Sequence, residues 1–165
     1  MKKNNYKKYE IEIRGYPSAK ILALGPVLYY LRDFDKEYEL YSIYWKVNYR
    51  GRIFLIDTGI KNIDYINSTV KGSFMWKRIE DVKKFDCIDY IFPTHLHYDH
   101  ASGIYDYKDS KIIINNKKYN NLVNDRYNVL FEEKIYRKEI LRRIKKKDSV
   151  NLYKDGEEII KGART

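Results

Sequence analysis

Alternating apolar and polar residues predict strands in the first third of the chain. The segment YEIEIR at 9–14 alternates strictly, which is typical of a strand with one buried face. A longer apolar stretch covers 20–31, and we expect a second strand there that bends at Gly25-Pro26, because proline has no backbone donor for a sheet. The segments LYSIYWKVNY and RIFLID are separated only by Arg50-Gly51, so they predict a hairpin over 40–57.

The spacing of apolar residues changes in the middle of the chain. Residues 60–72 are polar and irregular. Apolar positions then recur as on one face of an amphipathic helix over 74–85, at Trp76, Ile79, Val82 and Phe85. The short apolar segment CIDYIF at 87–92 is followed by a proline and predicts a buried strand, with Cys87 in the core.

The last third predicts helices and strands in alternation. ASGIYDY at 101–107 favours a short helix, and KIIIN at 111–115 favours a strand. Residues 117–147 are predicted to be helical. Parts of the apolar face of this helix come from Phe131, Ile135, Leu141 and Ile144. VNLY and EEII, on either side of Lys154-Asp155-Gly156, predict a closing hairpin.

This order of elements predicts an α/β layered domain in which helices flank a mixed sheet. A length of 165 residues is typical of a single domain, which we assign to 1–165. The longest apolar run, at 21–31, is too short to cross a bilayer, and the amino terminus lacks the apolar stretch of a signal peptide. Together with the single cysteine, these features predict a soluble cytoplasmic protein.

The net charge of +10 raises the question of a nucleic-acid partner. The chain is rich in lysine, asparagine, isoleucine and tyrosine, whose codons are rich in A and T, so a low-GC genome accounts for the bias. The strongest basic segment is YRKEILRRIKKK at 136–147. It lacks the interleaved aromatic residues that stack on bases, and we interpret it as a solvated helix face. We therefore do not expect nucleic acid or a membrane as a partner.

All three histidines lie within the heptad THLHYDH at 94–100. In an extended segment, residues two apart point to the same side, so His95 and His97 can bind one ion. Asp99 and His100 follow at once. Imidazole and carboxylate groups suit zinc, and after it iron or manganese. The heptad also follows a predicted strand, which is where open α/β sheets place their sites.

The segment HLHYDH resembles the HxHxDH signature of the metallo-β-lactamase superfamily of hydrolases. The surrounding sequence agrees with that resemblance, because Thr94 precedes the first histidine, RIFLIDTG ends the predicted hairpin, and Ala101-Ser102-Gly103 follows the motif. Within the superfamily, THLHYDHASG is most similar to the lactonase-like branch.

The resemblance implies a fold, a cofactor and a reaction. The fold would be the αββα sandwich of the superfamily, with two zinc ions in the complete site. His95 and His97 would bind the first ion, and Asp99 and His100 the second, with Asp57 supporting the ligand loop. The implied reaction is hydrolysis of a small ester, lactone or thioester through a metal-bound hydroxide, which Asp99 would orient as the catalytic residue.

The chain departs from the family pattern after the motif. The family has two further histidines and a bridging aspartate downstream, whereas no histidine follows His100. None of the remaining aspartates that could replace them sits in a matching motif: Asp106, Asp109, Asp125, Asp148 and Asp155. We therefore expect an apparently truncated, amino-terminal portion of the sandwich, which self-associates or binds a complementing carboxy-terminal half.

Two alternatives to a hydrolase remain open from the sequence. The first is an inactive metal-binding or interaction fragment, which the absent downstream ligands favour. The second is a nuclease of the same fold, which the basic segment at 136–147 favours.

Overall fold

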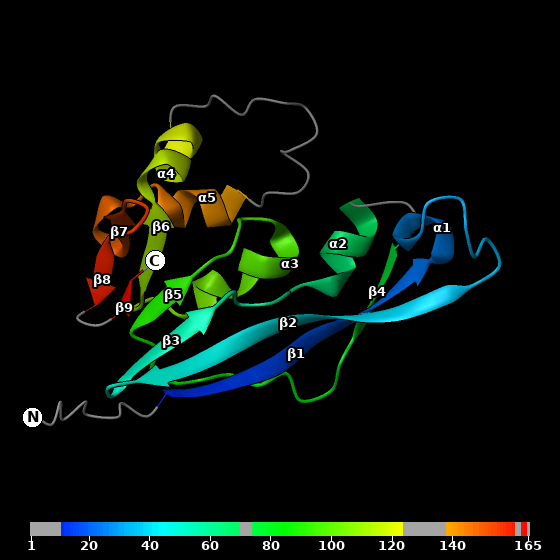
Figure 1. The fold of residues 1–165 in the computed structure, drawn as a ribbon, viewed down its shortest axis with the longest axis horizontal. Helices are drawn as coiled ribbons and strands as arrows, with labels where there is room; N and C mark the ends of the chain where they lie inside the picture. Colours follow the sequence, from blue (N-terminus) through cyan, green and yellow to red (C-terminus); the bar gives the residue numbers. More distant parts are fainter. Residues whose placement is uncertain (1–10, 70–73, 124–137, 161–162, 165) are drawn as a thin grey trace, which may run out of the picture.

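One mixed sheet carries the helices on one side. The computed structural model describes residues 11–69, 74–123, 138–160 and 163–164. Among these residues, α2, α3, α4 and α5 all lie on the same side of the sheet (Figure 1). The bounds of the helices are α1 Gly25–Leu28, α2 Ile63–Thr69, α3 Tyr98–Ala101, α4 Asn116–Val123 and α5 Lys138–Ile144. A 3-10 helix, Ser102–Asp106, continues α3.

The strands of the described residues form a seven-stranded sheet and a separate pair. In chain order the sheet contains β1 Ile11–Leu24, β2 Glu37–Tyr49, β3 Arg52–Ile56, β4 Phe74–Arg78, β5 Tyr90–Phe92, β6 Lys111–Asn115 and β7 Val150–Tyr153. Their spatial order is β4-β1-β2-β3-β5-β6-β7, antiparallel as far as β3 and parallel from β3 to β7. The short strands β8 Glu158–Ile160 and β9 Ala163–Arg164 pair with each other. The predicted mixed sheet with flanking helices is confirmed.

Several predicted elements are confirmed. The hairpin over 40–57 corresponds to β2 and β3, and Arg50 and Gly51 at its turn have φ of 53° and 73°. Two successive left-handed residues give the turn whose twist matches the strands. The strand at 111–115 has the bounds predicted for it, and the short helix predicted at 101–107 corresponds to the end of α3 and the 3-10 helix.

The amino-terminal prediction of two strands is wrong. One long strand, β1, runs from Ile11 to Leu24 beside β2, and residues 9 and 10 lie outside the described residues. Gly25-Pro26 does not bend a strand but begins the helical turn α1. Proline suits the first turn of a helix, because the amide hydrogen that it lacks has no partner there.

The predictions for 60–85 are also wrong. Residues 60–72 contain α2, and the expected helix at 74–85 is the strand β4 followed by an irregular segment. The helical spacing was misleading because the outer edge of β1 offers backbone hydrogen bonds to β4, whose Trp76 lies opposite Ile21 and points into the core. Tertiary pairing commonly overrides a local pattern in this way.

Three further expectations need correction. Cys87 is exposed, and the strand around it begins only at Tyr90. The closing hairpin does not form, because β7 pairs with β6 in the main sheet while β8 pairs with β9. The helix predicted over 117–147 is described only as α4 and α5, and residues 124–137, including Phe131 and Ile135, lie outside the described residues.

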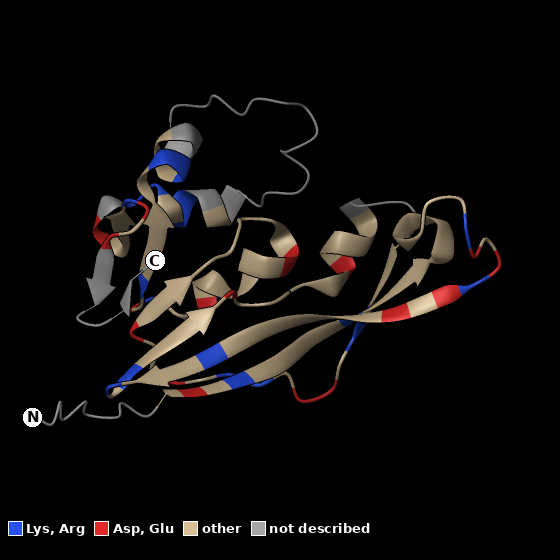
Figure 2. Ribbon diagram, in the orientation of Figure 1, with Lys and Arg blue, Asp and Glu red and all other residues tan. Residues whose placement is uncertain are grey.

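Charged residues are unevenly distributed over these elements. Figure 2 shows acidic residues at the beginning of β2 and basic residues on α4 and α5. On α5, however, Arg143 is buried, and it donates to the carbonyl oxygens of Tyr107, Lys108 and Ser110. Part of the basic segment therefore holds the fold together instead of facing solvent.

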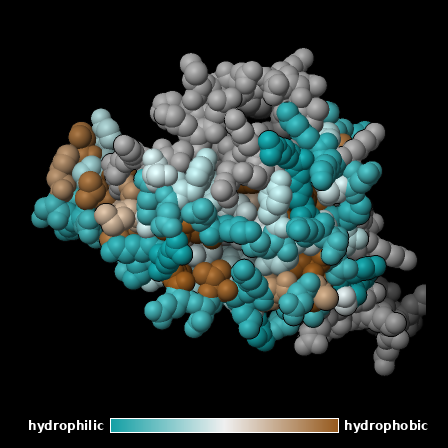
Figure 3. Space-filling model, turned by 180° about the vertical axis from the view of Figure 1, so that it is seen from behind, coloured by the Kyte–Doolittle hydropathy of each residue, from teal (hydrophilic) through white to brown (hydrophobic). Residues whose placement is uncertain are grey.

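Apolar side chains remain exposed on the side of the sheet away from the helices. Residues that pair across β1 and β2 point to the same face of the sheet. We call the face of these two strands that points away from the helices the open sheet face. Its exposed apolar members include Ile11, Ile13, Ile43 and Trp45, at 56%, 58%, 41% and 43% exposure. Figure 3 shows such apolar side chains interrupting the polar surface, in addition to those at the end where α1 lies. No helix among the described residues is both long and apolar enough to cross a membrane.

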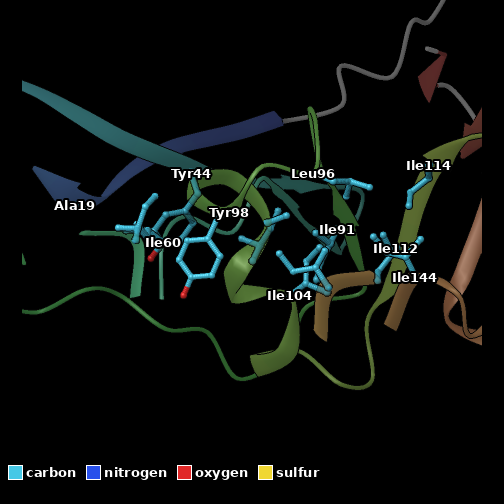
Figure 4. Packing of buried hydrophobic residues seen from close by; sticks show 14 of the residues in the cluster. Ala19, Tyr44, Ile60, Ile91, Leu96, Tyr98, Ile104, Ile112, Ile114 and Ile144 are labelled. Atoms are coloured by element: carbon cyan, nitrogen blue, oxygen red, sulfur yellow. The ribbon is translucent and has the colours of Figure 1, made fainter. Parts of the chain in front are cut away.

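The core lies between the sheet and the helices. It is built from alternate residues of the central strands and from inward-facing residues of the helical segments (Figure 4). Central members are Tyr44, Leu55, Ile91, Ile104, Ile112, Ile140 and Ile144. The three strands β3, β5 and β6 thereby pack into the core, and their carboxyl ends carry the segments described next.

Candidate metal-binding site

The ends of two parallel strands bring the predicted site residues together. β3 and β5 are parallel neighbours, so the segments after Ile56 and Phe92 emerge at the same edge of the sheet. The backbone N–H of Asp57 donates to the carbonyl oxygen of Phe92 at 2.9 Å. Asp57 and the beginning of the histidine heptad therefore lie side by side, although 37 positions separate Asp57 from Thr94.

Asp57 is a buried carboxylate that accepts several hydrogen bonds. It is 4% exposed, and its backbone has a φ of 61°, a left-handed conformation that aspartate tolerates better than most residues. It accepts from the backbone N–H of Thr94 at 2.7 Å, from the Thr94 hydroxyl at 2.9 Å and from Nδ1 of His100 at 2.8 Å. Asp57 thus fixes both ends of the heptad to β3.

The leucine between the first two histidines turns both imidazoles away from the core. Leu96 is 7% exposed and belongs to the core cluster, as Figure 4 shows. His95 and His97 are half-buried, and their ring centroids lie 4.4 Å apart. The structure therefore agrees with the expectation that these two side chains share one side.

His95, Asp99 and His100 form a cluster that could hold a metal ion. One possible ligand atom from each of the three lies within 4.8 Å of the others. The rings of His95 and His100 have centroids 4.0 Å apart, and Nε2 of His100 lies 3.3 Å from Oδ2 of Asp99. His97 is outside this trio but contacts His95 through its ring.

The hydrogen bonds determine which ring nitrogens are left for a ligand. An ionised carboxylate only accepts, so the Thr94 hydroxyl donates to Asp57 and can accept a hydrogen bond from Nδ1 of His95, which lies 3.1 Å away. Nδ1 of His100 likewise donates to Asp57. His95 therefore keeps Nε2 for another partner, whereas Nε2 of His100 faces Oδ2 of Asp99 at 3.3 Å. In both rings a hydrogen bond at Nδ1 sets the orientation, which is how second partners commonly orient metal-binding histidines.

Burial and charge shift the titration of these groups. Hydrogen bonds to Asp57 and then to Asp99 raise the pKa of His100 to about 9, against the effect of burial. Burial lowers the pKa of His95, and the neighbouring His100 and His97 lower it further. Burial alone would raise the pKa of Asp99, but its hydrogen bond with His100 and the charge of that ring bring the pKa below its ordinary value.

The donor set fits a zinc ion. Two imidazoles and a carboxylate are the ligand types that catalytic zinc uses, with three protein ligands and one open position. Asp57 supplies the carboxylate that such a site places behind an imidazole. Iron and manganese accept the same ligand types.

The backbone of α3 is held from outside the motif. The carbonyl oxygen of His100 accepts from the N–H of Thr58 at 2.7 Å and from the Thr58 hydroxyl at 3.1 Å, and Gly59 forms a bridge with Ala101. The hydroxyl of Ser42 donates to the carbonyl oxygen of Asp99 at 3.1 Å. The sequence predicts no role for Ser42, because a single serine in an apolar strand carries no motif; its one signal is a hydroxyl among core-facing residues.

The aspartates considered as replacement ligands lie elsewhere. Asp106 forms an ion pair with Lys61, and Asp155 accepts from Nδ2 of Asn115 at 2.7 Å. Asp109 and Asp148 are exposed, and Asp125 lies outside the described residues. Within the part of the chain that the structure describes, none of them joins the cluster of His95, Asp99 and His100.

A comparison with protein families matches most of the chain. The model described as the metallo-beta-lactamase superfamily covers residues 41–162, which include the whole histidine heptad. A comparison with curated proteins finds no match.

Several solved structures have a similar fold. An N-acyl homoserine lactone hydrolase with N-hexanoyl-L-homoserine bound at its catalytic metal centre is 18% identical, with a TM-score of 0.67, over 91% of this chain and 62% of that one. A dizinc quorum-quenching lactonase is 14% identical, with a TM-score of 0.64, over 92% of this chain and 61% of that one. A probable metal-dependent hydrolase from Staphylococcus aureus is 15% identical, with a TM-score of 0.60, over 92% of this chain and 62% of that one. The chain thus spans less than two thirds of each of these proteins.

Proposed function

Because the chain belongs to the metallo-beta-lactamase superfamily, we propose that it is a zinc-dependent hydrolase of a small ester, lactone or thioester. One observation carries the proposal: ligand atoms of His95, Asp99 and His100 converge at the carboxyl edge of the parallel strands. A zinc ion held there would lower the pKa of water and polarise a carbonyl oxygen.

We propose distinct roles for the residues around this cluster. His95, His97, Asp99 and His100 hold the metal. Asp57 orients His100 directly, and it orients His95 through the Thr94 hydroxyl. Asp99 is the proposed catalytic residue, because its carboxylate lies in the cluster with His95 and His100, where it can accept a hydrogen bond from the attacking water and orient it.

A lactone is the substrate class that we propose to test first. Two of the similar solved proteins are described as lactone hydrolases or lactonases, and both hold N-hexanoyl-L-homoserine, a lactone hydrolysis product. Their identity of 18% and 14% supports a common fold, so the choice of substrate rests on our proposal alone.

We further propose that efficient catalysis needs more ligands than the described residues provide. The heptad supplies four predicted ligands, whereas a site for two zinc ions with three or more protein ligands each needs more. The similar solved proteins are longer, with 61–62% of their chains covered. A complementing segment would supply the rest.

The alternative is a metal-binding protein without hydrolytic activity. Such a protein would bind zinc at the same cluster of His95, Asp99 and His100, but it would not hydrolyse a substrate. The nuclease hypothesis stays a second alternative; of its basic segment, Arg143 donates to three carbonyl oxygens, while Arg142, Lys145 and Lys146 are exposed.

The proposal is tested by metal-dependent hydrolysis. The purified chain is loaded with zinc and assayed with an N-acyl homoserine lactone, an aryl ester and a thioester. We expect slow turnover that a chelator removes and His95→Ala abolishes. Tight zinc binding without turnover would favour the non-catalytic alternative, and turnover that survives both treatments would contradict the proposed site.

A further inference from the structure

Two buried serines connect the amino-terminal strands to the helix that carries Asp99. Ser18 of β1 is 3% exposed and Ser42 of β2 is 8% exposed. Neither belongs to the histidine motif, and Ser18 lies outside the residues matched by the family model. Buried hydroxyl groups need hydrogen-bond partners, and the partners of these two lead to the candidate metal site.

A β-bulge lets Ser18 and Ala19 both face inward. The register between β1 and β2 shifts between Pro17 and Ala19, which leaves Ser18 as an extra residue on β1. Successive side chains of a regular strand point to opposite faces, yet Ser18 and Ala19 are both buried, at 3% and 0% exposure. A bulge redirects a side chain in this way, and bulges are frequent beside functional sites.

The two hydroxyl groups form a chain of hydrogen bonds with a fixed direction. Ser18 Oγ accepts from the backbone N–H of Ile60 at 3.1 Å and donates to Ser42, whose Oγ and carbonyl oxygen lie 3.0 and 3.2 Å away. Ser42 Oγ donates in turn to the carbonyl oxygen of Asp99 at 3.1 Å. The direction is set because an amide can only donate and a carbonyl can only accept.

Gly59 permits this close approach. Its φ is 66°, and a Cβ at this position would lie 2.4 Å from Cβ of Ser18. Only glycine fits both the backbone conformation and the space. The loop that follows Asp57 therefore packs directly on the bulge.

We propose that Ser42, supported by Ser18, is a positioning residue for the metal site. Its target, α3, has only four residues and is too short to maintain its own place. The bond to the Asp99 carbonyl fixes this turn relative to the sheet, and with it the Asp99 carboxylate and the His100 ring. The inference rests on the proposed zinc-dependent function.

The test compares two serines that make the same kind of hydrogen bond at opposite ends of the parallel strands. Ser110, 3% exposed, donates to the carbonyl oxygen of Ile88 at 2.7 Å, before β5 and β6 begin. Zinc affinity of the full chain is measured by competition with a chromophoric chelator, and folding by circular dichroism and thermal melting. Ser42→Ala should weaken zinc binding about 10- to 100-fold, as loss of a group that orients ligands typically does. Ser110→Ala should keep the zinc affinity within about twofold of the wild type. It should lower Tm about as much as Ser42→Ala does, because each variant loses one buried hydrogen bond.

Two further variants separate positioning from folding. Ser42→Thr keeps the hydroxyl on a residue that suits a strand and should restore zinc affinity. Ser18→Ala leaves the bond to Asp99 in place and should give an intermediate loss. If Ser42→Ala and Ser110→Ala bind zinc equally well, the positioning role is overturned and the proposed zinc site stands. If the wild-type chain binds no zinc, the proposed function fails and the positioning role fails with it.

Discussion

At the scale of single residues, the site depends on an alternation of inward and outward side chains. Leu96 is anchored in the core, and its two neighbours project to the opposite side. Asp57 then fixes Thr94 and His100 through a buried carboxylate in a left-handed conformation. The rings of His95 and His100 are therefore oriented before any ligand binds, which reduces the entropy lost on metal binding.

His97 provides the residue-level prediction. It lies outside the trio of converging ligand atoms, but its ring contacts His95, and we expect it to bind the same metal. His97→Ala should lower zinc affinity about tenfold or more, measured by chelator competition. Lys84→Ala, which changes an exposed residue, serves as the control. Equal affinity in the two variants would remove His97 from the ligand set.

At the scale of elements, the two edges of the parallel strands have different tasks. The carboxyl ends of these strands carry the candidate site, and Asp89 connects their amino ends. Its carboxylate accepts from the N–H of Ile53 at 2.8 Å and from Arg52 at 2.7 Å. Its carbonyl oxygen accepts from the N–H of Lys111 at 2.9 Å. Asp89 therefore connects β3, β5 and β6 where they begin.

Asp89 provides the element-level prediction, on pH. The backbone N–H of Ile53 and then the Arg52 guanidinium lower the pKa of Asp89 from its ordinary value of 3.8. Because the folded pKa is the lower one, the ionised carboxylate stabilises the fold above pH 3.8, and this contribution is lost as the pH falls through the folded value.

The measurement compares Tm across pH for the wild type and Asp89→Asn. The variant should melt at a lower temperature at pH 7, and the difference should shrink as the pH is lowered below about 4. A difference that stayed constant down to pH 3 would show that ionisation of Asp89 does not contribute to stability.

At the scale of the whole molecule, the sheet has one covered face and one open face. The helices bury the inner residues of the central strands, while Ile13, Ile43 and Trp45 of the open sheet face stay 58%, 41% and 43% exposed. The Trp45 ring lies against Gly15, 3.0 Å from where a Cβ would be, and so covers backbone that has no side chain of its own. Large exposed apolar patches usually mark association sites.

We expect the purified chain to self-associate through the open sheet face. A second copy is the only available partner in such a sample, and two apolar sheet faces can pack against each other. The combined substitutions Ile13→Lys and Ile43→Lys should shift sedimentation toward the monomer and reduce binding of a hydrophobic dye several-fold. Val82→Lys, at an exposed apolar position of the irregular segment after β4, is the control. A dye-negative monomer in the wild type would show that this face needs no cover.

The second prediction at this scale concerns activity. Fusing the carboxy-terminal segment of one of the longer similar proteins should raise lactone turnover of the zinc-loaded chain by at least about a hundredfold. Misplacement of reacting groups by about an ångström already costs this much, and extra ligands would place the metal more firmly. His95→Ala in the fusion should abolish the gain. Equal turnover with and without the added segment would show that the heptad and its neighbours suffice.

Much of the fold and the cluster of site residues could be predicted from the sequence, because each depends on a local pattern. The β2–β3 hairpin follows from alternation around Arg50-Gly51, and β6 from a short apolar run. The heptad combines histidine, leucine and aspartate in an order that predicts ligands on one side and an anchor on the other. These features depend on residues that are close together in the sequence, so the local sequence alone predicts them.

Only the tertiary structure decided how distant segments meet. The apolar spacing at 74–85 fits a helix, but β1 offers a free edge, and the hydrogen bonds of that edge make residues 74–78 a strand. Ser18 and Ser42 carry no motif, and their link to Asp99 exists because a bulge shifts the β1–β2 register by one residue. Register and edge pairing are set by hydrogen bonds between segments far apart in sequence, and a local period contains no information about them.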